Sequence, residues 1–345
     1  PEVILSCSME GTAKLSQQFH KIIRHNVCRG KYQLSQRPIL INNWEATYFN
    51  FNGEKIKKET ELKDHKAAFE LLVKELIDNK IVDSLDEIAG IGHRIVQGGS
   101  YFDKTVLATE DNISIVEKLS SLAPLHNPAA VVGIRAAQSV FPNATQTLVF
   151  DTAFHQTMPE EAYLYGLPYE YYENPVPYEW YTKYAVRRYG AHGTSHKYVS
   201  MRANEILDNE DARLITCHIG NGASISAVKA GKCVETSMGL TPNAGLMMGT
   251  RCGDIDATIL PYIMEETGMS AKEMDTALNK QSGLLGISGV SSDSRDIEDG
   301  INNGDERCIL AQKMYVKRIV DFIAKYYVEL GGCDAIIFTA GVGEN

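Results

Sequence analysis

Two arginines of this chain lie beside glycines, in the segments Gly92-His93-Arg94 and Met248-Gly249-Thr250-Arg251. Because glycine has no side chain, the backbone there can approach an anion closely while the guanidinium group binds it through two parallel hydrogen bonds. An isolated arginine is usually a solvated surface cation. In this sequence context we predict Arg94 and Arg251 as anion-binding residues. Phosphoryl transfer requires such groups, because charge develops on the phosphoryl oxygens.

Asp151 and His192 are two further polar residues at points where elements should begin or end. Asp151 follows Leu148-Val149-Phe150, which predicts a short buried strand, and a carboxylate at such a place is costly without a partner. The N-terminus of a following helix is the ordinary partner. A lone histidine is most often a satisfied core or surface group, and that alternative stays open for His126, His155 and His196.

A glycine loop, Gly220-Asn221-Gly222-Ala223-Ser224, joins the apolar run at 214–217 to the run at 225–228. The residues 225–236 then read as a hairpin. P-loops and dinucleotide-binding fingerprints need a helix directly after the glycines, so this loop is neither. We expect the backbone N–H groups of Asn221, Gly222 and Ala223 to face phosphate groups.

Helical spacing of apolar residues predicts two of the elements that support these loops. The first helix follows Asp64 as its N-cap and carries Phe69, Leu72 and Leu76 on one face. The second contains Met314 to Tyr326 and ends at Gly331-Gly332. A strand at 335–338 then leads into a second glycine-rich loop.

Seven segments of the chain together resemble the acetate kinase family. They lie at residues 92–99, 124–128, 149–155, 190–196, 218–224, 248–254 and 338–345. The resemblance implies an α/β chain with the two-domain actin-like or sugar-kinase (ribonuclease H-like) fold. It also implies transfer of a phosphoryl group from ATP to acetate, giving acetyl phosphate and ADP, with Mg²⁺ as the metal.

The resemblance also implies roles for individual residues. Arg94, Asp151, His192 and Arg251 would be catalytic: the arginines would bind the carboxylate and the phosphoryl group, His192 would hydrogen-bond that phosphoryl group, and Asp151 would be the Mg²⁺ ligand. The residues expected to bind the nucleotide are His218, Asn221, Gly222, Ala223, Asp293, Ser294, Arg295, Gly341, Val342, Gly343, Glu344 and Asn345. For the residues at 293–295 and 341–345, ordinary turn chemistry is the alternative.

The acyl group of the substrate is expected to contact Arg94, Val96, Leu125, Ala191 and Pro242. The family usually has Phe where this chain has Ala191. Loss of that ring would enlarge the pocket, and each extra buried methylene is worth roughly 0.8 kcal/mol. A propionate or butyrate kinase of the same fold is therefore an alternative.

The expected division of the chain is 1–52, 53–153 and 154–345. Residues 1–52 resemble a segment of bacterial α-galactosidases, on the aromatic-rich run at 38–51. The strands that carry that family's catalytic carboxylates are absent, so no glycosidase activity is expected. The other two segments would be partial first and second kinase domains, incomplete at both termini. The activity of this chain is therefore doubtful, and a catalytically inactive fusion fragment is a further alternative.

Composition limits the classes of partner. The chain has 345 residues and a net charge of -10, which disfavours nucleic acid, and no apolar stretch reaches the length of a membrane span. Seven cysteines without a Cys-x-x-Cys pair are typical of reduced thiols in the cytoplasm. The family resemblance adds a homodimer as the expected assembly.

Overall fold

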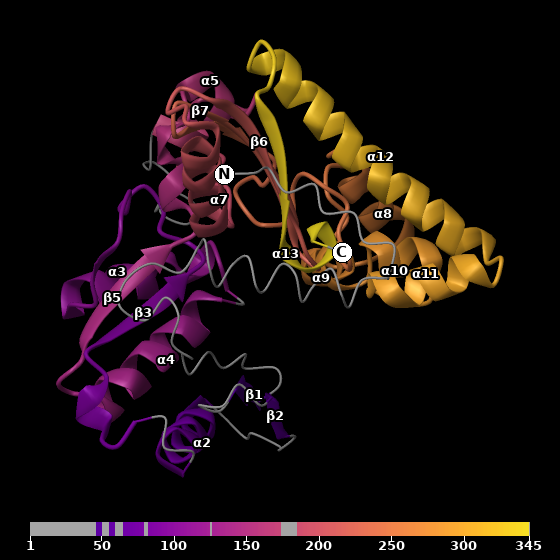
Figure 1. Cartoon of the computed structure of the whole chain (residues 1–345). Helices are drawn as coiled ribbons and strands as arrows, with labels where there is room; N and C mark the ends of the chain where they lie inside the picture. The colour runs from indigo at the N-terminus through magenta and orange to yellow at the C-terminus, as the bar shows by residue number, and fades with distance from the viewer. Residues whose placement is uncertain are drawn as a thin grey trace.

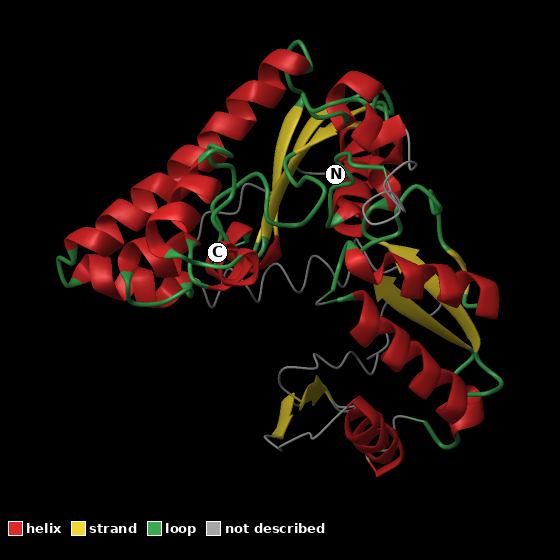
Figure 2. Cartoon of the chain, turned by 180° about the vertical axis from the view of Figure 1, so that it is seen from behind, coloured by secondary structure: helices red, strands yellow, loops and turns green. Residues whose placement is uncertain are grey.

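The computed structural model describes residues 46–49, 55–58, 65–78, 82–124, 126–173 and 185–344. The predicted residues Leu125 and Asn345, and the predicted N-cap Asp64, lie outside these ranges. Within them the chain is a mixed α/β structure whose strands form separate sheets flanked by helices (Figures 1 and 2).

The first part of the chain contains a three-stranded sheet in the order β3-β5-β4. β3 (Gly90–Ile95) and β5 (Thr145–Phe150) are parallel, and β4 (Val106–Leu107) is antiparallel to β5. The helices α3 (Glu110–Lys118) and α4 (Asn127–Val140) pack on it through a core that includes Ile95, Ile113, Val116, Ile134 and Leu148. The expected strand before Asp151 is confirmed as the end of β5.

Upstream of this sheet lie a small hairpin and a helix. β1 (Ala46–Phe49) and β2 (Lys55–Lys58) are antiparallel, and α2 (His65–Asp78) follows them. The predicted helix after Asp64 is confirmed.

The second sheet has the order β8-β7-β6-β9. β6 (Arg213–Ile219), β7 (Ala223–Lys229) and β8 (Lys232–Thr236) form an antiparallel meander, and β9 (Ala335–Thr339) is parallel to β6. The register pairs Ile219 with Ala223, so the glycine loop is a tight strand-turn-strand connection, as predicted. The predicted hairpin and the strand at 335–338 are also confirmed.

Two long helices cover the two faces of this sheet (Figures 1 and 2). α12 (Glu306–Glu329) packs through Cys308, Ala311 and Tyr315, and it ends before Gly331 and Gly332, whose positive φ angles reverse the chain. α7 (Gly193–Leu207) packs on the other face through Ala203. α7 also contacts β5, so this helix joins the two sheets.

The remaining helices are short. They are η2 (Leu85–Glu87), η3 (Leu119–Ser121), η4 (Ala153–Thr157), α5 (Glu160–Tyr163), α6 (Glu170–Glu173), α8 (Ile259–Thr267), α9 (Ala271–Lys280), α10 (Gly283–Ser288), α11 (Ser294–Asn302) and α13 (Ala340–Gly343). Among the described residues, no helix combines the length and the apolar character that a membrane crossing requires.

Candidate active site

Arg94 and Asp151 form an ion pair at the ends of the parallel strands β3 and β5. Arg94 Nε donates to Asp151 Oδ1 at 3.1 Å, and a terminal nitrogen donates to Oδ2 at 2.6 Å. The Asp151 side chain is 1% exposed, whereas that of Arg94 is 63% exposed. The hydrogen bond to Asp151 raises the pKa of Arg94 above its usual value. The buried carboxylate therefore has a cationic partner, and the guanidinium group still reaches solvent, where it can contact an anion.

His192 lies at the N-terminus of α7, directly beside this ion pair. Its φ of 58° is left-handed, and its backbone N–H donates to Asp151 Oδ2 at 3.4 Å. The imidazole ring stacks on that of His218, with ring centroids 4.2 Å apart. Burial lowers the pKa of His192 well below its usual value, and nearby His218, Arg94 and Arg251 lower it further. The ring is therefore neutral near pH 7.

Arg251 approaches the same place from the loop after Met248. One terminal nitrogen donates to the carbonyl oxygen of Pro242 at 2.9 Å. Burial and the positive charge of Arg94 lower the pKa of Arg251. A methyl group built on Gly222 would lie 3.4 Å from Arg251 Nη1 and 3.6 Å from His192 Nε2, so these three residues border one small space. The structure thus brings together all four residues predicted as catalytic.

His126 belongs to this group as well. It lies immediately before α4, and the nearby positive charges of Arg251 and Arg94 add to burial in lowering its pKa. His155 is different. Its Nε2–H donates to the carbonyl oxygen of Ala191 at 2.9 Å, and burial lowers its pKa to about 4. His155 is therefore an ordinary core histidine, buried and with its hydrogen bonds satisfied.

The predicted nucleotide residues come together from three parts of the chain. The turn at 220–222 lies next to α13, since a methyl group on Gly220 would be 3.7 Å from Ala340 Cβ and one on Gly343 would be 3.5 Å from Ile219 Cβ. The carbonyl oxygen of Asn221 accepts from the backbone N–H of Gly249 at 3.1 Å. Gly249 in turn approaches the carbonyl oxygen of Ser292, next to Asp293.

Asp293 shows the ordinary turn chemistry that was the alternative to nucleotide binding. It is the N-cap of α11: its Oδ1 accepts from the backbone N–H of Arg295 at 2.9 Å, and Oδ2 accepts from the Arg295 guanidinium at 2.6 Å. These bonds lower the pKa of Asp293 to about 2. The Arg295 side chain is 86% exposed and remains accessible to a ligand.

The residues predicted around the acyl group are only partly brought together. Val96 and Pro242 are half-buried, and both belong to the segments of Arg94 and Arg251. Ala191 is 3% exposed, and its side chain packs in the core cluster of the second sheet. The methyl group of Ala191 therefore has packed neighbours, and a larger ring there would have to displace them.

Sequence reasoning missed the hydroxyl groups that bind the site histidines. Ser224 Oγ lies 2.8 Å from His192 Nδ1 and 2.8 Å from His196 Nε2, and Ser195 Oγ lies 2.9 Å from His218 Nδ1. Thr216 Oγ1 lies 2.7 Å from His196 Nδ1. His192 is the left-handed N-cap residue of α7, so helical spacing from His196 does not apply to it and gave no signal for these hydroxyl groups.

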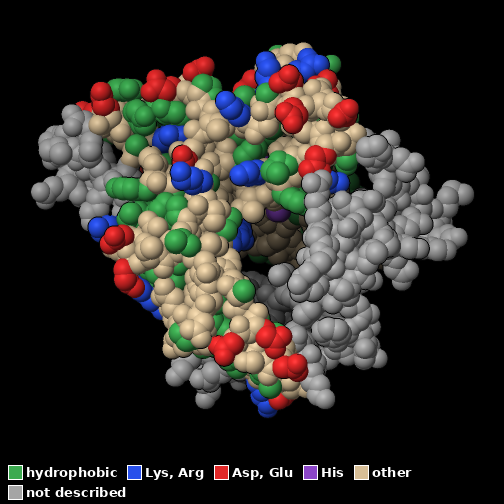
Figure 3. Space-filling model, turned by 60° about the vertical axis from the view of Figure 1, so that its left-hand side comes forward, with side chains coloured by type: hydrophobic (Ala, Val, Ile, Leu, Met, Phe, Trp, Pro, Cys, Tyr) green, Lys and Arg blue, Asp and Glu red, His purple; other side chains and the backbone are tan. Residues whose placement is uncertain are grey.

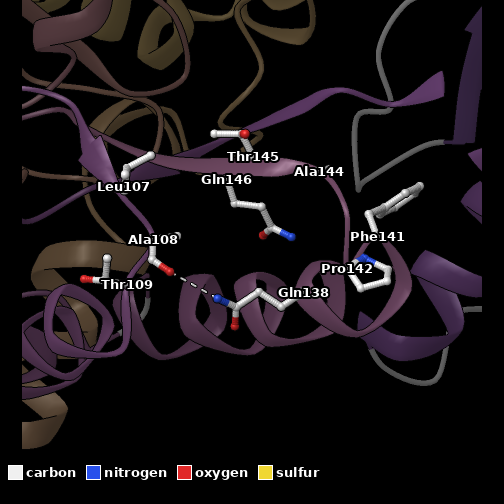
Figure 4. Close-up of a pocket in the computed structure, with 9 residues that line it drawn as sticks. All are labelled: Leu107, Ala108, Thr109, Gln138, Phe141, Pro142, Ala144, Thr145 and Gln146. Atoms are coloured by element: carbon white, nitrogen blue, oxygen red, sulfur yellow. Dashed lines mark hydrogen bonds between the residues drawn. The ribbon is translucent and has the colours of Figure 1, made fainter. Parts of the chain in front are cut away.

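Figure 3 shows a recess in one face of the molecule, with a histidine side chain and Lys or Arg side chains at its edge. A separate depression of about 450 Å³ lies on the first sheet between β4, β5 and the end of α4 (Figure 4). Its lining contains Gln138, whose Nε2 donates to the carbonyl oxygen of Ala108 at 3.1 Å, and no charged residue. None of the predicted site residues lines this second depression.

Comparisons with known proteins identify the family of the chain. The model of the acetokinase family matches residues 25–345, a range that begins within the stretch 1–52. The chain is 55% identical over 296 residues to the acetate kinase of Geobacillus kaustophilus, covering 85% of this chain and 72% of the relative. It is 54% identical over 306 residues to the acetate kinase of Anoxybacillus flavithermus, covering 88% and 75%.

Solved structures give the same result. A Porphyromonas gingivalis acetate kinase superposes with a TM-score of 0.78 at 48% identity, covering 87% of this chain and 74% of that one. A Francisella tularensis propionate kinase superposes with a TM-score of 0.80 at 45% identity and the same coverage. The chain therefore has the actin-like α/β fold that the sequence predicted. On the family model and these identities, it belongs to the acetokinase family.

Proposed function

We propose that this chain transfers a phosphoryl group between ATP and acetate, giving ADP and acetyl phosphate. The observation that carries the proposal is the meeting of Arg94, Arg251 and His192 beside the turn at Gly222. Two guanidinium groups close to each other favour a reaction between two anions, since the carboxylate and the phosphate repel each other without them. The relatives named as acetate kinases support the same reaction.

In the proposed reaction an acetate oxygen attacks the γ-phosphorus in line with the departing oxygen of ADP. One P–O bond forms as the other breaks, and no proton is transferred. Arg94 and Arg251 hold the carboxylate and offset the charge on the equatorial oxygens, and His192 hydrogen-bonds one of these oxygens. The backbone N–H groups of the turn at 221–223 contact the nucleotide phosphates.

ATP and ADP are the nucleotides of this family, and we propose Mg²⁺ as the metal. Among the described residues, Asp151 Oδ1 accepts only from Arg94 Nε, so this buried oxygen keeps capacity for a cation. The described residues contain no cluster of three or more His, Cys, Asp or Glu side chains that would form a complete metal cage. A site of this kind suits Mg²⁺, which usually takes one or two carboxylates together with phosphates and water. When bound, Mg²⁺ would neutralise charge on the phosphates.

The proposed nucleotide subsite consists of His218, the turn at 221–223, the start of α11 at 293–295 and the loop at 341–345. The proximity of the turn to α13 and to Ser292 supports it. Because the Asp293 carboxylate caps α11 and binds Arg295, we assign contact with the nucleotide to Ser294 and to the exposed Arg295 rather than to that carboxylate.

Propionate or butyrate is the second proposed acceptor. The superposition on a propionate kinase at 45% identity favours it specifically, and so does the small Ala191 beside the arginine loops. The burial of Ala191 weighs against a wide acyl pocket. Acetate therefore remains the first choice, with Arg94, Val96, Leu125, Ala191 and Pro242 as the proposed acyl contacts.

The test is a trapping assay on the 345-residue chain. Acyl phosphates formed from ATP, Mg²⁺ and each of acetate, propionate and butyrate are converted to hydroxamates with hydroxylamine. We expect the largest kcat/KM for acetate. A larger value for propionate or butyrate would select the second acceptor. Absence of hydroxamate with all three acids would overturn the proposal and leave a catalytically inactive protein of the family.

Further assignments concern the domains, the assembly and the location. We propose domains at 53–153 and 154–345, which agree with the two sheets. An α-galactosidase-like segment at 1–52 is proposed on the sequence resemblance alone, and the acetokinase family model already covers residues 25–52 of it. A homodimer is proposed from the family resemblance. The free thiols at Cys217, Cys233, Cys252, Cys308 and Cys333 support a location in the cytoplasm.

A further inference from the structure

Four side chains form a continuous row of hydrogen bonds that begins inside the second sheet and ends in the active site. The row runs from Thr216 on β6 through His196 on α7 and Ser224 on β7 to His192. Its three links measure 2.7, 2.8 and 2.8 Å. Thr216, His196 and Ser224 have no exposed surface, so water does not substitute for any of these partners. The described mechanism uses only the last member of the row.

The Ser224 hydroxyl makes the two histidines depend on each other. It has one hydrogen, and a histidine nitrogen lies on each side of its oxygen. The hydroxyl therefore donates to one ring and accepts from the other. Each ring nitrogen in the row faces a hydroxyl group and not a carboxylate, so no anion compensates a second proton on either ring and each ring carries a single N–H. Only two arrangements of the hydrogens satisfy the whole row.

In the first arrangement Thr216 donates to His196 Nδ1, His196 Nε2–H donates to Ser224, and Ser224 donates to His192 Nδ1. His192 then carries its hydrogen on Nε2. In the second arrangement every bond is reversed, and His192 Nε2 has a lone pair. The other acceptor within reach of Thr216 is the carbonyl oxygen of Ser226, at 3.4 Å, whereas His196 Nδ1 lies at 2.7 Å. A distance of 2.7 Å lies at the mode for O–H donors and at the short limit for N–H donors. The first arrangement therefore satisfies Thr216 better.

The outward end of the row faces the place where the reaction occurs. His192 Nε2 lies beside Gly222 and Arg251, and no hydrogen-bond partner for it exists within the described residues. An N–H at this position suits an anionic oxygen, and a lone pair would repel it. A phosphoryl group beside His192 therefore favours the same arrangement as Thr216 does.

We propose that Ser224, supported by His196 and Thr216, is a positioning residue that holds His192 in the tautomer with its hydrogen on Nε2. This inference rests on the proposed function for its catalytic meaning. Its consequence is that His192 donates a hydrogen bond to the transferring phosphoryl group as a neutral ring, without first gaining a proton. Loss of the Ser224 hydroxyl leaves Nδ1 of His192 without its donor, and the hydrogen then distributes between both ring nitrogens.

The experiment reads the tautomer directly, by long-range ¹H–¹⁵N correlation spectra of the imidazole rings in the ¹⁵N-histidine-labelled chain. Spectra are recorded with and without ADP, Mg²⁺ and inorganic phosphate, and the His192 signals are assigned by their loss in His192→Asn. With phosphate present we expect a protonated Nε2 and an unprotonated Nδ1 in the wild type. In Ser224→Ala we expect both His192 nitrogens to move toward intermediate shifts.

The matched control is Ser226→Ala, on the same strand and also fully buried, whose Oγ bonds Thr236 Oγ1 at 2.8 Å and not a histidine. This variant should keep the wild-type spectrum of His192. Ser224→Thr retains a hydroxyl and should restore the tautomer. If Ser224→Ala does not fold, Ser224→Cys and Thr216→Val weaken the row at two different links, and each should produce a partial shift.

Turnover provides the second readout. Ser224→Ala should lower kcat about tenfold to a hundredfold, change KM for ATP less than threefold, and recover in Ser224→Thr. A His192 hydrogen on Nδ1 in the wild type with phosphate bound, or an unchanged His192 spectrum in Ser224→Ala, would overturn the inference. Unchanged kcat in Ser224→Ala would also overturn it while the proposed function stands. Absence of turnover in the wild type would overturn the proposed function but not this inference, because the spectra are recorded without any reaction.

Discussion

The backbone N–H of Gly193 donates to the carbonyl oxygen of Asp151 at 2.9 Å, which joins the first turn of α7 to the end of β5. A methyl group on Gly193 would overlap that oxygen and would lie 3.1 Å from Phe154 Cβ. The neighbouring residue His192 also donates its backbone N–H to the Asp151 carboxylate. This contact, which only glycine permits, fixes the position of Asp151, the proposed metal ligand, relative to His192, the proposed hydrogen-bond donor to the phosphoryl group.

The first prediction follows from this contact. Gly193→Ala should lower the free energy of unfolding by about 1 to 3 kcal/mol, because the overlap forces α7 away from β5. It should also lower kcat at least tenfold by moving His192 relative to Asp151. Urea unfolding and the hydroxylamine assay measure the two effects.

The control for this substitution is Gly133→Ala in α4, where nothing lies within 4 Å of the new methyl group. Helix propensity predicts a gain of about 0.5 to 1 kcal/mol there and unchanged turnover. Equal stability of Gly193→Ala and the wild type would show that the backbone at Asp151 moves to accommodate the methyl group without a cost in free energy.

The second prediction separates the two arginines. Arg94→Ala and Arg251→Ala should each remove about 2 to 4 kcal/mol of transition-state stabilisation, read from kcat/KM. Only Arg94→Ala should also lower the stability of the protein, because it leaves the buried Asp151 carboxylate without its cation. Arg251 binds a backbone carbonyl and not a carboxylate, so its loss leaves no buried charge without a partner.

Arg135→Ala is the control for both arginines, since Arg135 lies on α4 in an exposed pair with Glu110. It should change neither activity nor stability by more than about 1 kcal/mol. A loss of turnover below tenfold in both Arg94→Ala and Arg251→Ala would contradict their assigned roles.

Much of this site was predictable because local sequence determines it. The strand-turn-strand geometry at 220–222 follows from apolar runs on both sides of a glycine loop, and the end of β5 follows from a buried run before Asp151. Arg94 and Arg251 were recognisable because each lies among glycines. These features depend on residues that are close together in the chain.

The partners across the site were not predictable in this way. The row from Thr216 to His192 depends on the register of β6 with β7 and on where α7 packs, and neither follows from local pattern. The same is true of Ala191: the substitution suggested an open pocket, whereas tertiary packing buries the residue. Asp293 was ambiguous because a helix cap and a ligand contact use the same residue types.

The third prediction concerns Ala191. Ala191→Phe should lower the free energy of unfolding by about 1 to 3 kcal/mol, because the ring must enter the packed core around Ala191. Activity with propionate and with acetate should then fall together. A selective loss with propionate in a protein of unchanged stability would contradict this, and would show that the ring points into the acyl site instead.

The last prediction concerns an acidic pair at the C-terminal end of α12, far along the chain from the catalytic residues. Burial and a hydrogen bond with Glu235 on β8 raise the pKa of Glu329 to about 7, and Lys325 forms an ion pair with the same Glu235. Between the ordinary pKa of a glutamate and pH 7, the native state therefore holds a proton that the unfolded chain has released. Stability falls as the pH rises through this window, and the full cost is present above pH 7.

Glu329→Gln removes this titration and keeps a hydrogen-bond donor toward Glu235. It should make the protein more stable than the wild type at pH 8, and by a much smaller margin at pH 5. The gain at pH 8 should be about 1 kcal/mol, because Glu329 is only partly buried and solvent screens its charge. Urea unfolding at the two pH values measures the difference, with Glu298→Gln on the exposed side of α11 as the control that should show no such dependence. An equal effect of Glu329→Gln at both pH values would mean that Glu235 and Glu329 do not share a proton, and that Lys325 alone compensates both carboxylates.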